Sequence, residues 1–334
     1  MKRKNIAFLL LFIFIAAVIY LTGESYYQGL ESTISHEPSE QTEYQYKYDM
    51  IVDNPDSEFW QAVYKSASET AGEYNVLLEL KNPGWGRIYD KEDYMNMSIA
   101  ARVDGIILQY SGEKEIEEKI NEAVDSGIPV VTVMGDPRYS ERQSFIGVSD
   151  YQLGQEYGQV VADYVNADTK KVMVFLSRSI DDMNESQIYT QISNAVASRA
   201  AEGQEIEVDG KNLLLTGDFE TEEAVTDIFQ QSSIPDILVC MDEEITECAR
   251  QAVIDFNKAG EVAIIGYYTS DDTLAALDKG VIAATCDIDT SQMGTYAIQA
   301  LTDYQEEGRT NAFYNVDIDF IRGKENGEKE GRRQ

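Results

Sequence analysis

The sequence predicts an α/β protein built from doubly wound parallel sheets with right-handed crossovers. Short apolar runs alternate with amphipathic stretches of helical period along almost the whole body of the chain, which is the pattern of repeated βαβ units. The predicted strands are too many for one sheet. With 334 residues, 43% of them hydrophobic, the chain is also long enough for two lobes with cores of their own.

The segment 104–154 shows this pattern best. It reads DGIILQY, then the acidic helix EKEIEEKINEAVDS, then GIPVVTVMGD and SFIGVSDYQLG, so that two apolar strands flank one amphipathic helix. The elements predicted before it are the strand Tyr48–Val52, the helix Glu58–Gly72, the strand Asn75–Leu80 and the helix Asp90–Ala101.

The same rhythm continues after Gly147. We predict helices at Tyr151–Val165, Glu185–Ala201, Thr221–Gln231, Glu244–Lys258, Asp271–Leu277 and Gln292–Gln305. The predicted strands are Lys171–Leu176, Asp236–Cys240, Val262–Gly266, Ile282–Cys286 and a terminal strand near Tyr314–Ile321.

The amino-acid sequence of segment 104–154 resembles that of the type I periplasmic binding proteins of the ribose-binding group, the substrate-binding proteins of sugar ABC transporters. A strand ending in DGII, a helix closing on Gly-Ile-Pro-Val-Val and the later Ile-Gly carry the resemblance. It implies two Rossmann-like lobes joined by a hinge of three crossovers, near Ser149, Ile288 and Asn311. The implied lobes are 46–149 with 288–311, and 150–287 with 312–322.

The formal charge of −33 bears on the partners. A surface this acidic repels phosphate backbones, so we expect no nucleic acid partner. The LacI-type repressors share the core of these binding proteins, but the place of their basic DNA-binding headpiece is taken here by an apolar segment.

That N-terminal segment predicts export. MKRK precedes an uncharged apolar run, Ile6–Leu21, which is short for a spanning helix and long for the core of a signal peptide. We favour an uncleaved signal anchor over 1–23, a single transmembrane helix that leaves the body on the extracytoplasmic side. We expect residues 24–45 to form a polar stalk, with a short helix packed on the first lobe as the alternative, and 323–334 to form a disordered tail.

Candidate ligand-binding residues follow from the carboxyl ends of the strands, which face the cleft in such sheets. The loop after the first strand carries an aromatic pair in the sugar-binding relatives, where it stacks on the sugar ring; Phe59 and Trp60 hold those positions. Phe59 is equally the first core residue of its helix, whereas Trp60 lies beside that apolar stripe. The full predicted set is Ser57, Phe59, Trp60, Tyr110, Met134, Asp136, Gln187, Met241, Asp242, Tyr268 and Asp287.

Several of these positions depart from the ribose-binding pattern. The relatives place Asp-Arg where this chain has Met134 and Gly135, an Asn at Met241 and an Asp at Tyr268, and those side chains bind sugar hydroxyls. Three outcomes therefore stay open: a reconstructed sugar site, a more apolar ligand, or a vestigial cleft. Asp136, near Arg138 and Arg142, is either a ligand contact or part of an internal salt bridge or turn.

We predict neither a catalytic site nor a bound metal or cofactor. The sequence has no HExxH, GxSxG or GxxxxGK[ST] motif, and its single histidine, His36, lies in the stalk. Cys240 and Cys248 are close enough for a disulfide, but buried thiols are favoured because the spacing matches no redox or zinc pattern.

The predicted function is that of an extracytoplasmic solute-binding protein that holds a carbohydrate or similar small molecule by closure of its two lobes. The partner that reads the closed form is either the permease of an ABC importer or, as the alternative, a membrane histidine kinase. An anchor fixes the binder beside a membrane partner and modestly favours the kinase.

Overall fold

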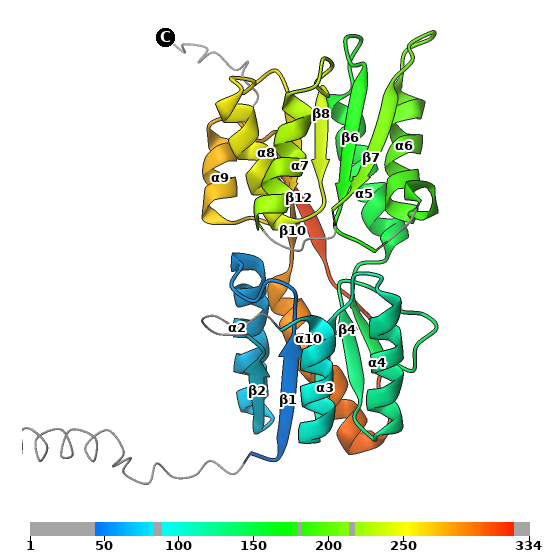
Figure 1. Ribbon diagram of the computed structural model, residues 1–334, viewed down its shortest axis with the longest axis vertical. Helices are drawn as coiled ribbons and strands as arrows, with labels where there is room; N and C mark the ends of the chain where they lie inside the picture. Colours follow the sequence, from blue (N-terminus) through cyan, green and yellow to red (C-terminus); the bar gives the residue numbers. More distant parts are fainter. Residues whose placement is uncertain (1–43, 83–88, 180–181, 214–217, 324–334) are drawn as a thin grey trace, which may run out of the picture. The chain divides into compact units, whose positions relative to one another are not determined.

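A computed structural model describes residues 44–82, 89–179, 182–213 and 218–323 of the chain. These residues form two six-stranded sheets with helices on both faces of each (Figure 1). The predicted fold of two α/β lobes with parallel sheets is thereby confirmed.

The first sheet has the strand order β11-β5-β4-β3-β1-β2, and all its neighbouring strands are parallel. Its strands are β1 (Tyr46–Ile51), β2 (Val76–Leu80), β3 (Gly105–Gln109), β4 (Val130–Val133), β5 (Ser144–Gly147) and β11 (Phe313–Asn315). Its helices are α2 (Glu58–Glu73), α3 (Lys91–Ala101), α4 (Lys114–Asp125) and α10 (Thr290–Glu307). We call this sheet with its helices the first lobe.

The second sheet has the order β12-β10-β9-β8-β6-β7. Its strands are β6 (Lys171–Leu176), β7 (Glu207–Asn212), β8 (Ile237–Cys240), β9 (Ala263–Tyr267), β10 (Ala284–Ile288) and β12 (Ile318–Arg322). Its helices are α5 (Asp150–Tyr164), the 3-10 helix η1 (Met183–Glu185), α6 (Gln187–Arg199), α7 (Asp218–Phe229), α8 (Glu243–Asp255) and α9 (Asp271–Asp278). We call these elements the second lobe.

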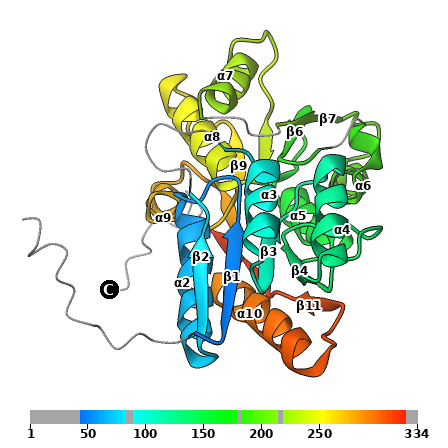
Figure 2. The same ribbon diagram turned by 60° about the horizontal axis from the view of Figure 1, so that its bottom comes forward.

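Alternation along the strands decides which helices cover which face. In the first lobe, Ile107 and Val131 pack with residues of α2 and α10, whereas Ile106, Leu108 and Val130 pack with α3 and α4 (Figure 2). Because neighbouring side chains of a strand point to opposite faces, a strand covered on both sides must be apolar throughout. This is why β3 and β4 are almost continuous apolar runs.

The end of the chain corrects one prediction. Phe313–Asn315 pairs parallel with β5, so this segment belongs to the first sheet and not, as predicted, to the second lobe. The third crossing is therefore at Val316–Asp317 rather than near Asn311. Sequence reasoning joined β11 and β12 into one strand because only two residues separate them.

Two further features of the second sheet differ from the prediction. β12 runs antiparallel to β10, because it continues the direction of β11 away from the carboxyl ends of the first sheet's strands. β7 was not predicted at all: its sequence, EVDGKN, carries no apolar pattern, and none of its residues is fully buried.

Hydrogen bonds link the three crossings to one another. The Val316 amide donates to the Gly147 carbonyl at 3.0 Å, and the Asp289 amide donates to the Asp317 carbonyl at 3.0 Å. The Gln292 side chain donates to the Asp317 carboxylate at 2.8 Å and accepts from its amide at 3.0 Å.

The predicted anchor, most of the stalk and the tail after Gly323 lie outside the described residues. Within the described ranges, no helix is long and apolar enough to cross a membrane. No disulfide joins Cys240 to Cys248; the side chain of Cys240 is buried, whereas that of Cys248 is half-buried.

Candidate functional site

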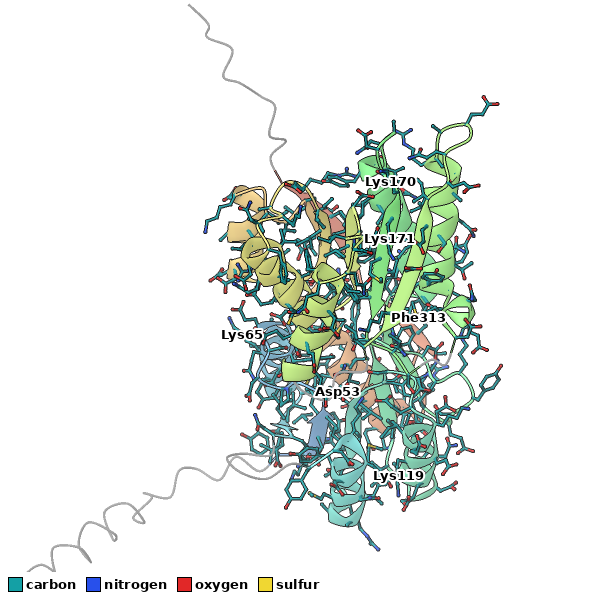
Figure 3. The ribbon with its side chains drawn as sticks, turned by 45° about the horizontal axis from the view of Figure 1, so that its top comes forward. Asp53, Lys65, Lys119, Lys170, Lys171 and Phe313 are labelled. Carbon is teal, nitrogen blue, oxygen red and sulfur yellow. The ribbon has the colours of Figure 1, made fainter. Side chains whose placement is uncertain are left out.

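The strand ends of the two lobes border two cavities. The first, of about 430 Å³, is lined by Asp53, Ser57, Phe59, Trp60, Met134 and Asp242 among others, and we call it the acidic cavity. The second, of about 530 Å³, includes Asp136, Arg138, Phe145, Arg178, Gln187 and Phe313 in its lining, and we call it the arginine cavity. In Figure 3, Asp53 and Phe313 lie where the lobes meet, whereas Lys119, Lys170 and Lys171 lie toward the outer ends. Both volumes are in the range of small-molecule sites.

Aromatic rings of both lobes meet beside the acidic cavity. The ring of Phe59 lies 4.9 Å from that of Trp60 on its own helix, and 5.7 Å and 5.3 Å from the rings of Tyr267 and Tyr268 in the second lobe. Phe59 and Trp60 are 3% and 5% exposed. The two alternatives for Phe59 are thus compatible, since its ring packs in the core and also lines the cavity.

A carboxylate of the second lobe binds the start of helix α2. One Glu243 oxygen accepts a hydrogen bond from the Phe59 amide at 3.1 Å, and the carboxylate also bonds the Ser57 hydroxyl. The Ser57 oxygen caps the helix by accepting from the Trp60 amide. Burial raises the pKa of Glu243, and the hydrogen bonds oppose that shift only in part. The N-terminus of α2 is therefore held by a group from the other lobe.

Asp242 is a half-buried carboxyl group at the start of α8. Its side chain accepts from the amides of Glu244 at 2.9 Å and Ile245 at 3.4 Å, as an N-cap does. Burial nevertheless raises the pKa of Asp242 to about 7. This group is consequently close to half protonated at neutral pH.

The acidic cavity has a strong negative character. Its lining includes the carboxylates of Asp53, Asp242, Glu243, Glu244 and Glu247, and no lysine or arginine among the residues described. Lys91 compensates one of them from outside the lining, because its ammonium lies 2.9 Å from Asp53. Burial still raises the pKa of Asp53. An anionic ligand would be repelled from this cavity.

Arg178, which sequence reasoning missed, bridges the lobes between the two cavities. It follows strand β6 of the second lobe, and its Nη2 donates to the Met134 carbonyl of the first lobe at 2.8 Å. The Asp150 carboxylate lies 3.4 Å from the same nitrogen. A Cβ on Gly135 would come within 2.7 Å of Arg178 Nη1, so the guanidinium passes directly over this glycine.

Two neighbouring contacts strengthen the bridge. The Ser179 amide of the second lobe donates to the Ser111 carbonyl of the first at 2.5 Å. The Tyr267 hydroxyl donates to the sulfur of Met134 at 3.3 Å. Met134 itself has a left-handed backbone conformation with φ of 71°.

We predict that Arg178→Ala loosens the contact between the lobes. The variant loses a part-buried hydrogen bond from a charged donor to the Met134 carbonyl, and hydrogen bonds to charged groups typically contribute about 1.5–3 kcal/mol. Hydrogen exchange should show the loosened contact between the lobes as faster exchange of the Ser179 amide. Arg322→Ala, which removes only an exposed ion pair with Asp163, is the control and should leave that amide unchanged. Equal protection of Ser179 in both variants would contradict the bridge.

Three predicted residues lie at the arginine cavity. The Tyr110 hydroxyl donates to Glu117 at 2.5 Å, and burial raises the pKa of this tyrosine. Asp136 forms ion pairs with Arg142 and Arg138, so the internal salt bridge considered from the sequence is present. Gln187 begins helix α6 and lines the cavity directly.

The remaining three predicted residues border neither cavity. Met241 is buried behind the strand end. Tyr268 has a left-handed φ of 67° and packs on Phe59, and the Asp287 carboxylate accepts from the Thr269 hydroxyl at 2.8 Å. Their roles as ligand contacts stay predictions.

Comparison with protein families now decides the broad assignment. The family model described as periplasmic binding protein domain matches residues 48–310, which is most of the chain. The protein belongs to this family. The resemblance drawn from segment 104–154 is thereby confirmed. A search of curated proteins found no match to this periplasmic binding protein.

Solved structures share the fold at low sequence identity. GanP, a glucose-galactose binding protein from Geobacillus stearothermophilus, is 24% identical with a TM-score of 0.72, and the match covers 84% of this chain and 99% of GanP. The XylFII molecule is 23% identical with a TM-score of 0.68, covering 83% of this chain and 98% of XylFII. A XylFII–LytSN complex matches with the same identity and TM-score, covering 83% and 97%.

Proposed function

We propose that this protein binds a sugar or sugar-like solute between its two lobes and reports the bound state to a membrane partner. The observation that carries the proposal is the set of groups from both lobes around the cleft, above all Arg178 with Met134 and Glu243 with Phe59. A ligand that contacts these groups changes the energy of lobe closure, and this is how binding is coupled to conformation.

Carbohydrate is the favoured ligand class for two reasons. The cleft combines aromatic rings with carboxylates, hydroxyls and amides, a combination that suits a ligand with apolar ring faces and many hydroxyl groups. GanP is described as a glucose-galactose binding protein, and other matched structures as arabinose-binding or ribose transport proteins. The eleven residues predicted from the sequence remain our proposed ligand set, now joined by Arg178.

The body is proposed to lie outside the cytoplasm, tethered by residues 1–23. Two partners remain in view, the permease of an ABC importer and a sensor of the histidine kinase type. The match to a XylFII–LytSN complex supports the second, because it is a complex of a protein of this fold with a second protein. Permease and ATPase genes beside the gene would favour import, and a two-component pair would favour sensing.

A thermal-shift screen against monosaccharides, oligosaccharides and nucleosides tests the ligand class. A compound that binds only the folded state stabilises it and so raises the melting temperature. At a ligand concentration of a hundred times the Kd, the free energy of unfolding increases by about 2.7 kcal/mol. If no carbohydrate at millimolar concentration shifts the melting temperature, the proposal fails.

We predict that Trp60→Ala weakens sugar binding by more than about 1 kcal/mol, because the variant removes a ring from the cavity wall. Isothermal titration calorimetry measures the change, and circular dichroism reports whether the fold is kept. Tyr74→Ala is the control. Tyr74 is the C-cap of α2, at the opposite end of the helix from Trp60, and it lines neither cavity. Unchanged affinity of a folded Trp60→Ala protein would remove Trp60 from the site.

A further inference from the structure

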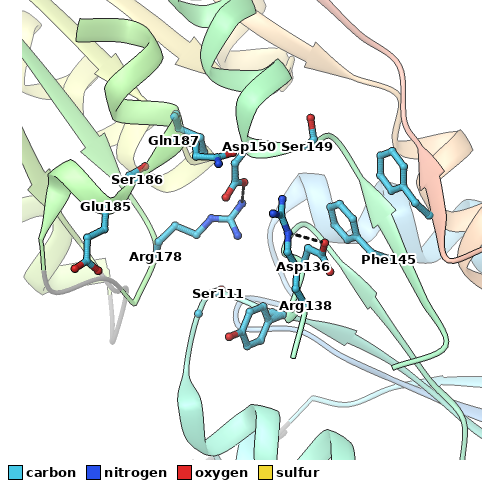
Figure 4. Close-up of a pocket in the computed structure, with 14 residues that line it drawn as sticks. Ser111, Asp136, Arg138, Phe145, Ser149, Asp150, Arg178, Glu185, Ser186 and Gln187 are labelled. Atoms are coloured by element: carbon cyan, nitrogen blue, oxygen red, sulfur yellow. Dashed lines mark hydrogen bonds and ion pairs between the residues drawn. The ribbon is translucent and has the colours of Figure 1, made fainter. Parts of the chain in front are cut away.

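The arginine cavity receives guanidinium groups from both lobes. Arg178 enters from the end of β6 in the second lobe, and Arg138 enters from the loop after β4 in the first (Figure 4). Acidic residues outnumber basic ones by 60 to 27 in the sequence, and in the lining of this cavity the two arginines lie beside the carboxylates of Asp136, Asp150 and Glu185. The acidic cavity, by contrast, has no arginine or lysine in its described lining.

Arg138 has most of its hydrogen-bonding capacity unused. Its Nε lies 3.3 Å from Asp136, but Arg142 already binds that carboxylate through Nε at 2.8 Å and through Nη2. Asp136 is thus shared by two arginines, which leaves one positive charge in excess. Within the described chain neither Nη of Arg138 has a hydrogen-bond partner, and the side chain is 64% exposed. A guanidinium in this state can receive a carboxylate through two parallel hydrogen bonds.

The other carboxylates at the cavity leave this charge in place. Asp150 is the ion-pair partner of Arg178 at 3.4 Å, so these two groups offset each other. The Glu185 side chain points away from both guanidiniums in Figure 4. The excess charge at Arg138 is therefore open to a ligand.

Apolar and neutral polar groups complete the wall. Phe313 stacks on Phe145 of the neighbouring strand, with ring centroids 5.2 Å apart and an angle of 16° between the rings, and Phe313 is 43% exposed. An exposed aromatic ring at a cavity is a suitable platform for the apolar face of a sugar ring. Gln187 and Ser111 add neutral hydrogen-bonding groups from opposite lobes.

We propose that the arginine cavity binds a monosaccharide that carries a carboxylate, a sugar acid of the uronic type. Arg138 receives the carboxylate, Phe313 packs on the ring, and Gln187 bonds ring hydroxyls. The inference rests on the proposed function, since it specifies which sugars that cleft takes. The adjoining acidic cavity acts in the same direction, because its carboxylates repel the acid group and orient it toward Arg138.

The experiment compares matched pairs of sugars by calorimetry at pH 7 and low salt. D-glucuronate and D-galacturonate are titrated against D-glucose and D-galactose, with sodium acetate as a carboxylate that lacks a ring. We expect at least one sugar acid to bind roughly tenfold or more tightly than its neutral counterpart. Added sodium chloride should lower the affinity for the sugar acid and leave the affinity for the neutral sugar unchanged.

Arg138→Gln tests the residue itself. The variant keeps a polar side chain at an exposed position, so the fold should be unaffected, and the affinity for the sugar acid should fall roughly tenfold. The affinity for the neutral sugar should stay within about threefold. Arg309→Gln is the matched control, because the Arg309 side chain is 84% exposed and the residue follows the end of α10, outside the lining of the cavity.

The outcomes separate the inference from the proposed function. Equal or weaker binding of both acids than of their neutral counterparts overturns the inference and leaves the proposed function standing. The inference is also overturned if acetate binds as tightly as the sugar acid, or if Arg138→Gln binds the acid as the parent protein does. If none of the four sugars binds, the inference is overturned, and the wider thermal-shift screen decides the fate of the proposed function.

Discussion

Gly135→Ala is expected to destabilise the protein by about 1–3 kcal/mol, the usual cost of forcing a group into a filled space. The added Cβ would lie 2.2 Å from the Tyr110 carbonyl oxygen, which is backbone and cannot rotate away. It would also lie 2.7 Å from Arg178 Nη1, so the guanidinium would have to leave its place over this residue. Urea unfolding measures the loss of stability.

The control for that variant is Gly72→Ala. Gly72 lies inside helix α2 with no atom within 4 Å of the position of an added Cβ. Alanine should therefore stabilise this helix by roughly 0.5–1 kcal/mol. If both variants had the same stability, the prediction that a Cβ at Gly135 clashes with Tyr110 and Arg178 would be wrong.

The second large effect is a loss of stability as pH rises toward 7, caused by Asp242. Its pKa of about 7 in the folded protein lies above the value of about 3.9 of an unfolded chain. Between these values the folded state holds a proton that the unfolded state has released. The free energy of unfolding should then fall by up to about 1.4 kcal/mol per pH unit as the pH rises, and level off above pH 7.

Asp242→Asn checks the assignment. Asparagine keeps the oxygen that accepts from the Glu244 and Ile245 amides but cannot ionise. The variant should resemble the parent protein at pH 4 and exceed its stability at pH 8. Urea unfolding at a series of pH values gives both curves. A smaller slope should remain, since burial also raises the pKa values of Glu243 and Asp53; an unchanged slope would remove Asp242 as its source.

The sequence predicted the elements well wherever burial determined the residue pattern. The strand Lys171–Leu176 was predicted with the bounds that the structure has, because all but its first residue are buried. β7 was missed for the opposite reason: this edge strand is held by backbone hydrogen bonds to β6, and its half-exposed side chains leave no periodic trace.

The candidate site was predictable in part. Phe59, Trp60, Met134 and Asp242 were named from strand ends and loops, and all four line the acidic cavity. Arg178 lies two residues after the strand Lys171–Leu176, so the same rule would have named it, but the more distant Gln187 was named for this strand end instead. The excess charge of Arg138 could not be foreseen, since it depends on Arg142 reaching Asp136 first, a matter of side-chain geometry.

The linked crossings limit the ways in which the lobes can move. Val316 is bonded to Gly147, and Asp317 to Asp289 and Gln292, so the three connecting segments lie side by side like the strands of a ribbon. A ribbon bends easily across its flat face but resists shear and twist, because those motions stretch the bonds between its strands. Relative motion of the lobes should then reduce to one bending angle, and a single spin-label pair placed across the cleft would suffice to follow it.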